Sequence, residues 1–297
     1  MLVRLRRWLT LGLLLTVVAV LVPDSARTEA DYALLKVERS HAVDWPRDVV
    51  WMLALGSDAR KGQSMTRSRA DSIHLVGVNA RTGNGVIIGL PRDSYVDIPG
   101  HGRDKINSSM VYGGPQLAAR TVQRLARVRL DYVFLTGFGG FAWLIHHLGG
   151  IRINPPQRMS GLGHSFPDRQ QWVNGSKALG FSRIRYGLPG GDFDRSRNQG
   201  RVLKAGLQRA REVADNPGRF ERMVAAAVAR MDTNLSPAEM YRVGRAVLTI
   251  RPNRVRNCVI PGGTGSAGGA SVVFLNRDAL SRVMRDVRRD ATLDRGC

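Results

Sequence analysis

Two aspartates beside neighbouring predicted strands are side chains that could do chemistry together. Asp58 follows an apolar run over residues 49–56, and Asp71 immediately precedes the next such run, over residues 72–79. Carboxylates at adjoining strand ends can hold a hard divalent cation, and Mg²⁺ typically takes one or two carboxylates and completes its shell with phosphate oxygens and water. An aspartate at such a place can equally be a turn or cap residue. The pair is the candidate metal site of this sequence.

Cations follow the next predicted strand. Arg92 and Asp93 come where the run over residues 85–91 meets a loop, and ligands of α/β sheets collect at such loops. Lys105 adds a positive charge shortly afterwards, in a segment that could also simply start a helix.

A denser cluster surrounds the glycine-rich loop at residues 187–191. Its members are Arg183, Arg185, Asp192, Arg195, Arg197 and Gln199. Arg183 and Arg185 share a face if the chain is extended there, and a helix beginning near Asp194 places Arg195 and Gln199 four residues apart on one face. The N-terminus of that helix would itself favour an anion. The pattern predicts a pyrophosphate site, with a solvated basic surface as the alternative.

Composition bounds the class of protein. The chain has 297 residues, of which 43% are hydrophobic, and two cysteines, so it is neither a disordered chain nor a disulfide scaffold. Lys and Arg number 45 against 24 acidic residues, a net charge of +21, which favours anionic partners. Five of the 45 are lysines, so arginine, the better fork for phosphate oxygens, dominates, although coding bias alone would have the same effect.

The N-terminal segment suggests the compartment. Three arginines within residues 1–8 precede an uncharged apolar run over residues 9–22. By the positive-inside rule this predicts a single-pass anchor in the cell membrane, with a cytoplasmic N-terminus and an extracytoplasmic domain. A cleaved signal peptide is the alternative, because the run is shorter than the roughly 20 residues of a usual span. We therefore divide the chain into a basic flank and anchor (1–30), a stalk (31–48) and a domain (49–297), and expect no nucleic acid as partner.

Alternating strand and helix patterns fill the domain. Strands are predicted over 49–56, 72–79, 85–91, 131–138, 149–154 and 255–260, and helices over 115–128, 141–148, 194–214, 217–231, 236–248 and 276–289. Residues 81–85 are typical of a hairpin turn. The fold class expected is α/β, a single three-layer domain with a central mixed β-sheet flanked by helices.

Two features in the last quarter of the chain have structural rather than catalytic interpretations. Residues 263–268 fit a G-x-G-x-x-G pattern, but a strand-like run follows where a dinucleotide site needs a helix, so we expect a loop. Cys258 and Cys297 could form a disulfide outside the membrane, or remain two free thiols.

Several spaced motifs, taken together, resemble one family. They are LALGSDAR (53–60), RADSI (69–73), LPRDSYVDIPG (90–100), DKIN (104–107), YGGP (112–115), LGGI (148–151), FSRIRY (181–186) and GDFDR (191–195). In this order they are similar to the LytR-CpsA-Psr family, with the match strongest over residues 49–210.

That resemblance implies a membrane-anchored phosphotransferase, which moves a glycopolymer from a polyprenyl pyrophosphate carrier onto peptidoglycan with Mg²⁺ as cofactor. A peptidoglycan hydroxyl would attack the sugar-proximal phosphorus, and polyprenyl phosphate would leave. The family's magnesium-site aspartates fall on Asp58 and Asp71. Its pyrophosphate-binding positions fall on Arg92, Lys105, Arg183, Arg185, Arg195 and Gln199, and Asp192 is supporting. Asp71 and the four arginines are the expected catalytic set, and Asp71 and Asp93 are candidate bases.

Three points stay open at this level. Asn198 stands where the family usually has an arginine, which favours the alternative function, a non-catalytic binder of polyprenyl pyrophosphates or anionic cell-wall polymer. The polymer could be a teichoic acid, arabinogalactan or a capsule. The carrier's tail needs an apolar groove, for which the candidates are Phe138, Phe141, Leu144, Ile145 and Leu148, or a helix over residues 223–231.

Overall fold

A computed structural model describes residues 30–38, 40, 49–216 and 218–297. A central sheet of seven strands runs through this described part in the order β12-β1-β7-β2-β3-β4-β13. These strands are β1 (Tyr32–Lys36), β2 (Val49–Ser57), β3 (Ala70–Asn79), β4 (Gly85–Gly89), β7 (Tyr132–Thr136), β12 (Met231–Thr233) and β13 (Val255–Val259). The sheet is mixed, because β2, β3 and β4 are antiparallel neighbours whereas β2 with β7 and β4 with β13 are parallel.

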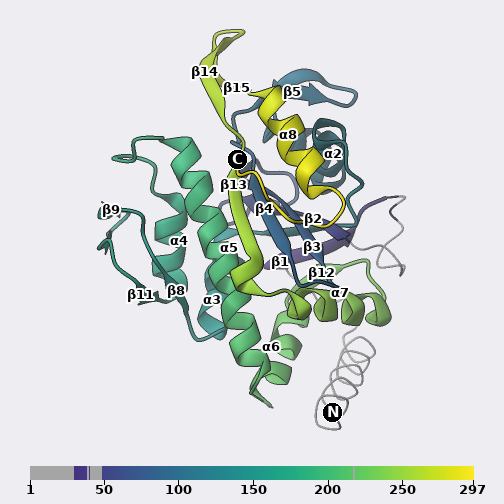
Figure 1. The fold of residues 1–297 in the computed structure, drawn as a ribbon, viewed down its shortest axis with the longest axis vertical. Coiled ribbons are helices and arrows are strands. Elements are labelled where there is room, and N and C mark those ends of the chain that lie inside the picture. Colours follow the sequence, from purple (N-terminus) through teal and green to yellow (C-terminus); the bar gives the residue numbers. More distant parts are fainter. Residues whose placement is uncertain (1–29, 39, 41–48, 217) are drawn as a thin grey trace.

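Helices cover both faces of the sheet, as predicted for a three-layer α/β domain (Figure 1). One face packs on α2 (Ser108–Ala126) and α8 (Arg277–Val287), through a core that includes Leu53, Leu75 and Leu117. The other packs on α6 (Arg219–Val228) and α7 (Pro237–Thr249), through a core that includes Tyr32 and Tyr132. Alternate strand residues point to opposite faces, which is why one sheet supplies both cores.

A long helix, α5 (Asp192–Ala214), lies close against the sheet. Two glycines permit this approach. A Cβ on Gly89 of β4 would lie 2.4 Å from Ser196 Oγ, and one on Gly200 would lie 2.1 Å from Asn257 Oδ1 of β13. The tight packing fixes the first turns of α5 relative to the ends of the strands.

An outer lobe flanks α5. It contains α3 (Phe138–His147), β8 (Ile151–Ile153), β9 (Met159–Gly161), β10 (His164–Phe166), β11 (Gln171–Val173) and α4 (Gly175–Arg183), around a third buried apolar cluster that includes Phe166 and Phe181. Strands β8 with β11 and β9 with β10 form two small antiparallel pairs.

Two hairpins project near the top of Figure 1. One pairs β5 (Tyr95–Ile98) with β6 (Gly102–Lys105), and the other pairs β14 (Gly262–Ala267) with β15 (Ala270–Leu275). The loop expected over residues 263–268 is therefore wrong. Residues 268 and 269 turn the chain with φ of +56° and +77°, which glycine adopts readily, and the preceding glycines pair with β15 as a strand.

Other sequence predictions also meet the structure. The first three strands of the domain, the hairpin between β3 and β4 and the Cys258–Cys297 disulfide are confirmed. A stalk over residues 31–48 is wrong for β1, which joins the sheet between β7 and β12 with Tyr32 fully buried. The predicted helix over 217–231 ends earlier, at Val228, because Met231 starts β12.

The expected membrane anchor lies outside the described residues. Within the described ranges, no helix combines the length and hydrophobicity required to span a bilayer.

Candidate active site

One edge of the sheet gathers the ends of several strands. Since β3 is antiparallel to β2 and β4, and β7 is parallel to β2, the ends of β2, β4 and β7 meet the start of β3. Asp58 follows β2, Asp71 opens β3 at a register shift opposite Gly56 and Ser57, and Arg92 follows β4. The strand ends thus bring together three residues singled out in the sequence.

Asp71 and Arg92 form an ion pair and a hydrogen bond between Oδ1 and Nη1. Burial disfavours the charge on Arg92, but the Asp71 carboxylate, together with Asp93 and Asp192, outweighs burial and raises the pKa of the arginine. Burial, followed by the charge of Asp71, raises the pKa of Asp58. The two aspartates therefore share a field in which a nearby cation would stabilise both ionised forms.

The donor set at these aspartates suits magnesium. The two carboxylates act on each other, and each lines one of two cavities that share Arg92 and Arg185. Mg²⁺ needs no more than one or two protein carboxylates when phosphate and water complete its shell. Among the described residues there is no group of three or more His, Cys, Asp or Glu side chains that could hold a metal. An ion here would therefore depend on oxygens from a bound ligand.

Arg183 and Arg185 line the same cavity as Asp71 and Arg92, but they do not lie on an extended strand. Arg183 is the last residue of α4, so the predicted strand-like spacing of the two arginines is wrong. Asn174 precedes the helix, and its side chain accepts a hydrogen bond from the Lys177 amide and caps the first turn. Ile184 leaves the helix in an extended conformation, and this turn brings Arg185 to the same cavity.

Neither of these two arginines has a carboxylate partner in the part of the chain that the structure describes. The Arg183 guanidinium lies 4.3 Å from the centre of the Phe138 ring, and Arg185 Nη2 donates to the Tyr186 hydroxyl at 2.6 Å. Aromatic faces and hydroxyls orient a guanidinium without neutralising it. Their charge remains available to an anion.

Arg195 completes the cationic wall from the first turn of α5. It is only 5% exposed and pairs through Nη2 with Asp192 Oδ1 at 2.5 Å. Burial lowers its pKa, and repulsion from Arg92 and Arg185 acts in the same direction. Its buried Nε has no hydrogen-bond partner among the described residues. A bound anion would supply a partner and relieve the repulsion.

Gln199, one helical turn beyond Arg195, joins three elements at this site. Its Nε2 donates to the backbone carbonyl of Ser182 at 3.2 Å and to that of Asp71 at 3.4 Å. Asn198 points elsewhere, since its oxygen accepts from Arg201 at 2.6 Å and its nitrogen lies 3.9 Å from Met159 Sδ. Position 198 is not on the cavity wall, so the absence of an arginine at this position leaves no gap in the wall.

These arginines border a cavity of about 390 Å³ that is otherwise mainly apolar. Phe138 and Phe141 line it, as the sequence suggested, but Leu144 and Ile145 do not. Leu144 packs into the core beside α6 and α7, and Ile145 is buried in the outer lobe, because successive helical residues face different directions. Leu148 and α6 are likewise absent from the wall.

A second cavity, of about 590 Å³, shares Arg92 and Arg185 with the first and is polar. Its wall contains Asp58, Arg69, Asp93, Asp104, Lys105 and Tyr112. Lys105 Nζ lies 3.0 Å from Asp93 Oδ1, and the Tyr112 hydroxyl donates to Asp104 Oδ2 at 2.6 Å. The site is thus an apolar chamber and a polar chamber that meet at the Arg92 and Arg185 guanidinium groups.

The geometry can be set beside known proteins. The LytR_cpsA_psr family profile matches residues 17–289, nearly the whole chain. The chain belongs to the LytR-CpsA-Psr family. The resemblance in the motifs is thereby confirmed.

Members of the family with related sequences include two proteins named polyisoprenyl-teichoic acid–peptidoglycan teichoic acid transferase TagU. The one from Enterococcus faecalis is 28% identical over 240 residues, covering 80% of this chain and 78% of the relative. The one from Bacillus licheniformis is 31% identical, covering 69% and 67% respectively. Among solved structures, the family protein YwtF (TagT) with bound octaprenyl pyrophosphate lipid shares the fold, at a TM-score of 0.66 and 22% identity over 90% of this chain and 98% of that one.

Much of the apolar wall of this cavity was not predicted from the sequence. Leu179, Ser182 and Arg183 line the cavity with the i, i+3, i+4 spacing of one helix face. The cap residue Asn174 was the signal that could have identified this helix. Leu162 and Tyr186 carried no comparable signal, because two loops that are separated in the sequence supply them.

Proposed function

We propose that this protein is a phosphotransferase that moves a glycopolymer from a polyprenyl pyrophosphate carrier onto peptidoglycan at the outer side of the cell membrane. The observation that supports this proposal most directly is that Arg183 and Arg185 line an apolar chamber. These two cations have no carboxylate partner among the described residues. Such a junction is complementary to an amphiphile whose long apolar chain ends in a diphosphate. Relatives named as polyisoprenyl-teichoic acid–peptidoglycan transferases support the same reaction class, and a teichoic-acid-type polymer as the first donor to try.

In this proposal the arginines bind and orient the pyrophosphate. Arg92, Arg183, Arg185 and Arg195 surround its oxygens, and Gln199 holds α5 against α4 and β3. An acceptor hydroxyl of peptidoglycan attacks the sugar-proximal phosphorus from the polar chamber. The bond between that phosphorus and the bridging oxygen breaks, and polyprenyl phosphate leaves in the apolar chamber. Fixed guanidinium groups stabilise the negative charge that develops, which is the main source of rate in phosphoryl transfer.

The carboxylates divide into two roles. Asp58 and Asp71 would hold Mg²⁺, which when bound would supply further charge neutralisation at the pyrophosphate. Asp71 lines the apolar chamber rather than the polar one and would be occupied by the metal, so it is poorly available as a base. Asp93 lies in the polar chamber beside Arg92 and Lys105, and we assign it to accept the proton from the acceptor hydroxyl.

The membrane location belongs to the proposal. Residues 9–22 are apolar and follow three arginines, which favours a single-pass anchor with a cytoplasmic N-terminus. The lipid donor and the peptidoglycan acceptor would then meet the catalytic domain outside the cell.

The test uses the full chain in nanodiscs with a synthetic polyprenyl pyrophosphate-linked saccharide, peptidoglycan, and either Mg²⁺ or EDTA. We expect polyprenyl phosphate release and attachment of the saccharide with Mg²⁺, and loss of both with EDTA or Asp71→Asn. Arg285→Ala on α8, an exposed site far along the chain from the motifs, is the matched control. Binding of the donor without product in every condition would replace the transferase with a non-catalytic lipid-pyrophosphate binder.

A further inference from the structure

A leucine occupies a turn that leucine disfavours. Strands β9 and β10 are joined by Leu162 and Gly163, with φ of +53° and +76°. Two-residue turns with both φ values positive favour Asn-Gly or Gly-Gly, and a bulky side chain in this region is strained. Leu162 is also 56% exposed. Neither local folding nor core packing accounts for a leucine here, and such strain commonly marks a functional position.

The turn lies at the opening of the apolar chamber. Leu162 lines that chamber together with Tyr186, which is 79% exposed. The hairpin and the Tyr186 loop are held together, since a Cβ on Gly161 would contact Ile184 at 3.1 Å and Gln157 Nε2 donates to the Gly187 carbonyl at 3.4 Å. We call Leu162 and Tyr186 the mouth. Two large apolar or amphipathic side chains thus face outward where the chamber opens.

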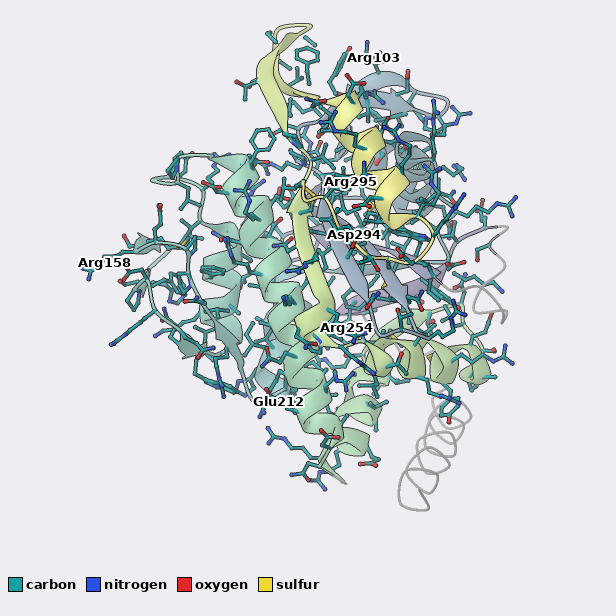
Figure 2. All side chains as sticks on the ribbon, viewed as in Figure 1. Arg103, Arg158, Glu212, Arg254, Asp294 and Arg295 are labelled. Carbon is teal, nitrogen blue, oxygen red and sulfur yellow. A yellow bond between two sulfur atoms is a disulfide. The ribbon has the colours of Figure 1, made fainter. Side chains whose placement is uncertain are left out.

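The outer lobe that carries the mouth is basic. Between residues 151 and 186 the exposed charged side chains are Arg152, Arg158, Arg169 and Lys177 against Asp168. Figure 2 shows Arg158 at the outer margin of this lobe. Exposed tyrosine and leucine side chains on a basic lobe favour the interface of an anionic bilayer.

We propose that the mouth docks on an anionic bilayer surface, with Leu162 inserted among the lipids and exposed arginines of the same lobe on the headgroups. The proposal rests on the proposed function in one respect, that the carrier's chain reaches the chamber from the bilayer. Docking here gives that chain a path from bilayer to chamber without crossing water, which explains why a strained leucine occupies the turn.

The cysteines of the chain make a direct test simple. Cys258 and Cys297 are joined in a disulfide, so an introduced cysteine is the thiol available for labelling. Full-length Leu162→Cys carries an environment-sensitive fluorophore in nanodiscs that contain doxyl-labelled lipid. Asp278→Cys, an exposed position on α8, is the matched control. We expect at least threefold stronger quenching at position 162 than at 278, and stronger quenching in phosphatidylglycerol than in phosphatidylcholine.

A second variant keeps the test independent of labelling at the strained turn. With the fluorophore at Tyr186→Cys, adding Leu162→Asn should reduce quenching at least twofold while the melting temperature stays equal or rises, because asparagine tolerates this turn. Equal quenching at positions 162 and 278, or protection of position 162 by a second copy of the chain in detergent, would overturn the docking. Transfer without quenching removes the docking and leaves the transferase, whereas quenching without transfer does the reverse.

Discussion

The two chambers differ in what surrounds their cations. Arg183 and Arg185, which line the apolar chamber, contact the Phe138 ring and the Tyr186 hydroxyl and have no carboxylate partner among the described residues. Arg92 and Lys105, which line the polar chamber, are paired with Asp71 and Asp93. Cationic side chains beside carboxylates are already neutralised, so their role is to position other groups and to form hydrogen bonds. Charges beside aromatic rings are not, so they attract an anion. The difference gives the site a direction, with the apolar chain on one side and hydroxyl groups on the other.

Removing the shared charge should have the largest effect. Arg185→Ala takes away a guanidinium that no described carboxylate neutralises, and we expect kcat/KM for transfer to fall by about 10²–10³-fold, as for loss of one preorganised transition-state donor. Arg185→Lys should recover part of the loss, because a point charge replaces the fork. A fall of less than about fivefold would mean that the boundary between the chambers does not carry the reaction.

Acid should lower the stability of the fold through His74, a buried residue of β3. Its ring contacts Ser72 Oγ at 3.1 Å and the Ser196 carbonyl at 3.0 Å, and complete burial lowers its pKa to about 4. The unfolded chain binds this proton below about pH 6.5, so stability is complete above that pH and declines toward pH 4, by about 3 kcal/mol in total. Thermal unfolding between pH 7 and 5 measures it. His74→Gln should flatten this component, and an unchanged pH slope would contradict it.

The apolar chamber should discriminate donors by chain length. Leu179→Asn places an amide in its wall, and we expect the KM for a long polyprenyl donor to rise about tenfold, since burying a leucine contributes about 1.5–3 kcal/mol. A short-chain donor should show little change. Leu179→Met, which conserves volume, is the control. An equal effect on both donors would remove the assignment of this chamber to the chain.

A substitution in the polar chamber should have the smallest effect, and it should act on peptidoglycan rather than on the lipid donor. Burial opposes the charge on Asp104, but hydrogen bonds from Tyr112 and the Lys105 amide lower its pKa, so it is an ionised acceptor at neutral pH. We expect Asp104→Asn to raise the KM for peptidoglycan about fivefold, the magnitude of one hydrogen bond. Donor affinity should be unchanged in a binding titration. Tyr112→Phe tests the same contact from the other side.

Much of this arrangement follows from the sequence. Short apolar runs separated by turn residues predicted β2, β3 and β4. The charged residues that follow or precede those runs meet at one edge of the sheet because the strands are neighbours in it. The residues predicted at the metal and pyrophosphate positions line the two chambers. The position of a side chain follows from the sequence where it depends on a few neighbouring residues.

The tertiary structure alone decided the rest, because those features depend on contacts between distant segments. The sequence does not indicate that β1, which contains Tyr32, pairs with β12. Nor does it indicate that the Asn198 side chain lies beside Met159, or that Leu144 and Ile145 belong to two different cores. Nor could it show that Arg183 ends a helix, or that Leu162 and Tyr186 share one opening. The sequence by itself determined which charged groups this protein brings to its site. Packing of α5 on the sheet and of α4 on α5 decided which of them stay neutralised and which face a ligand.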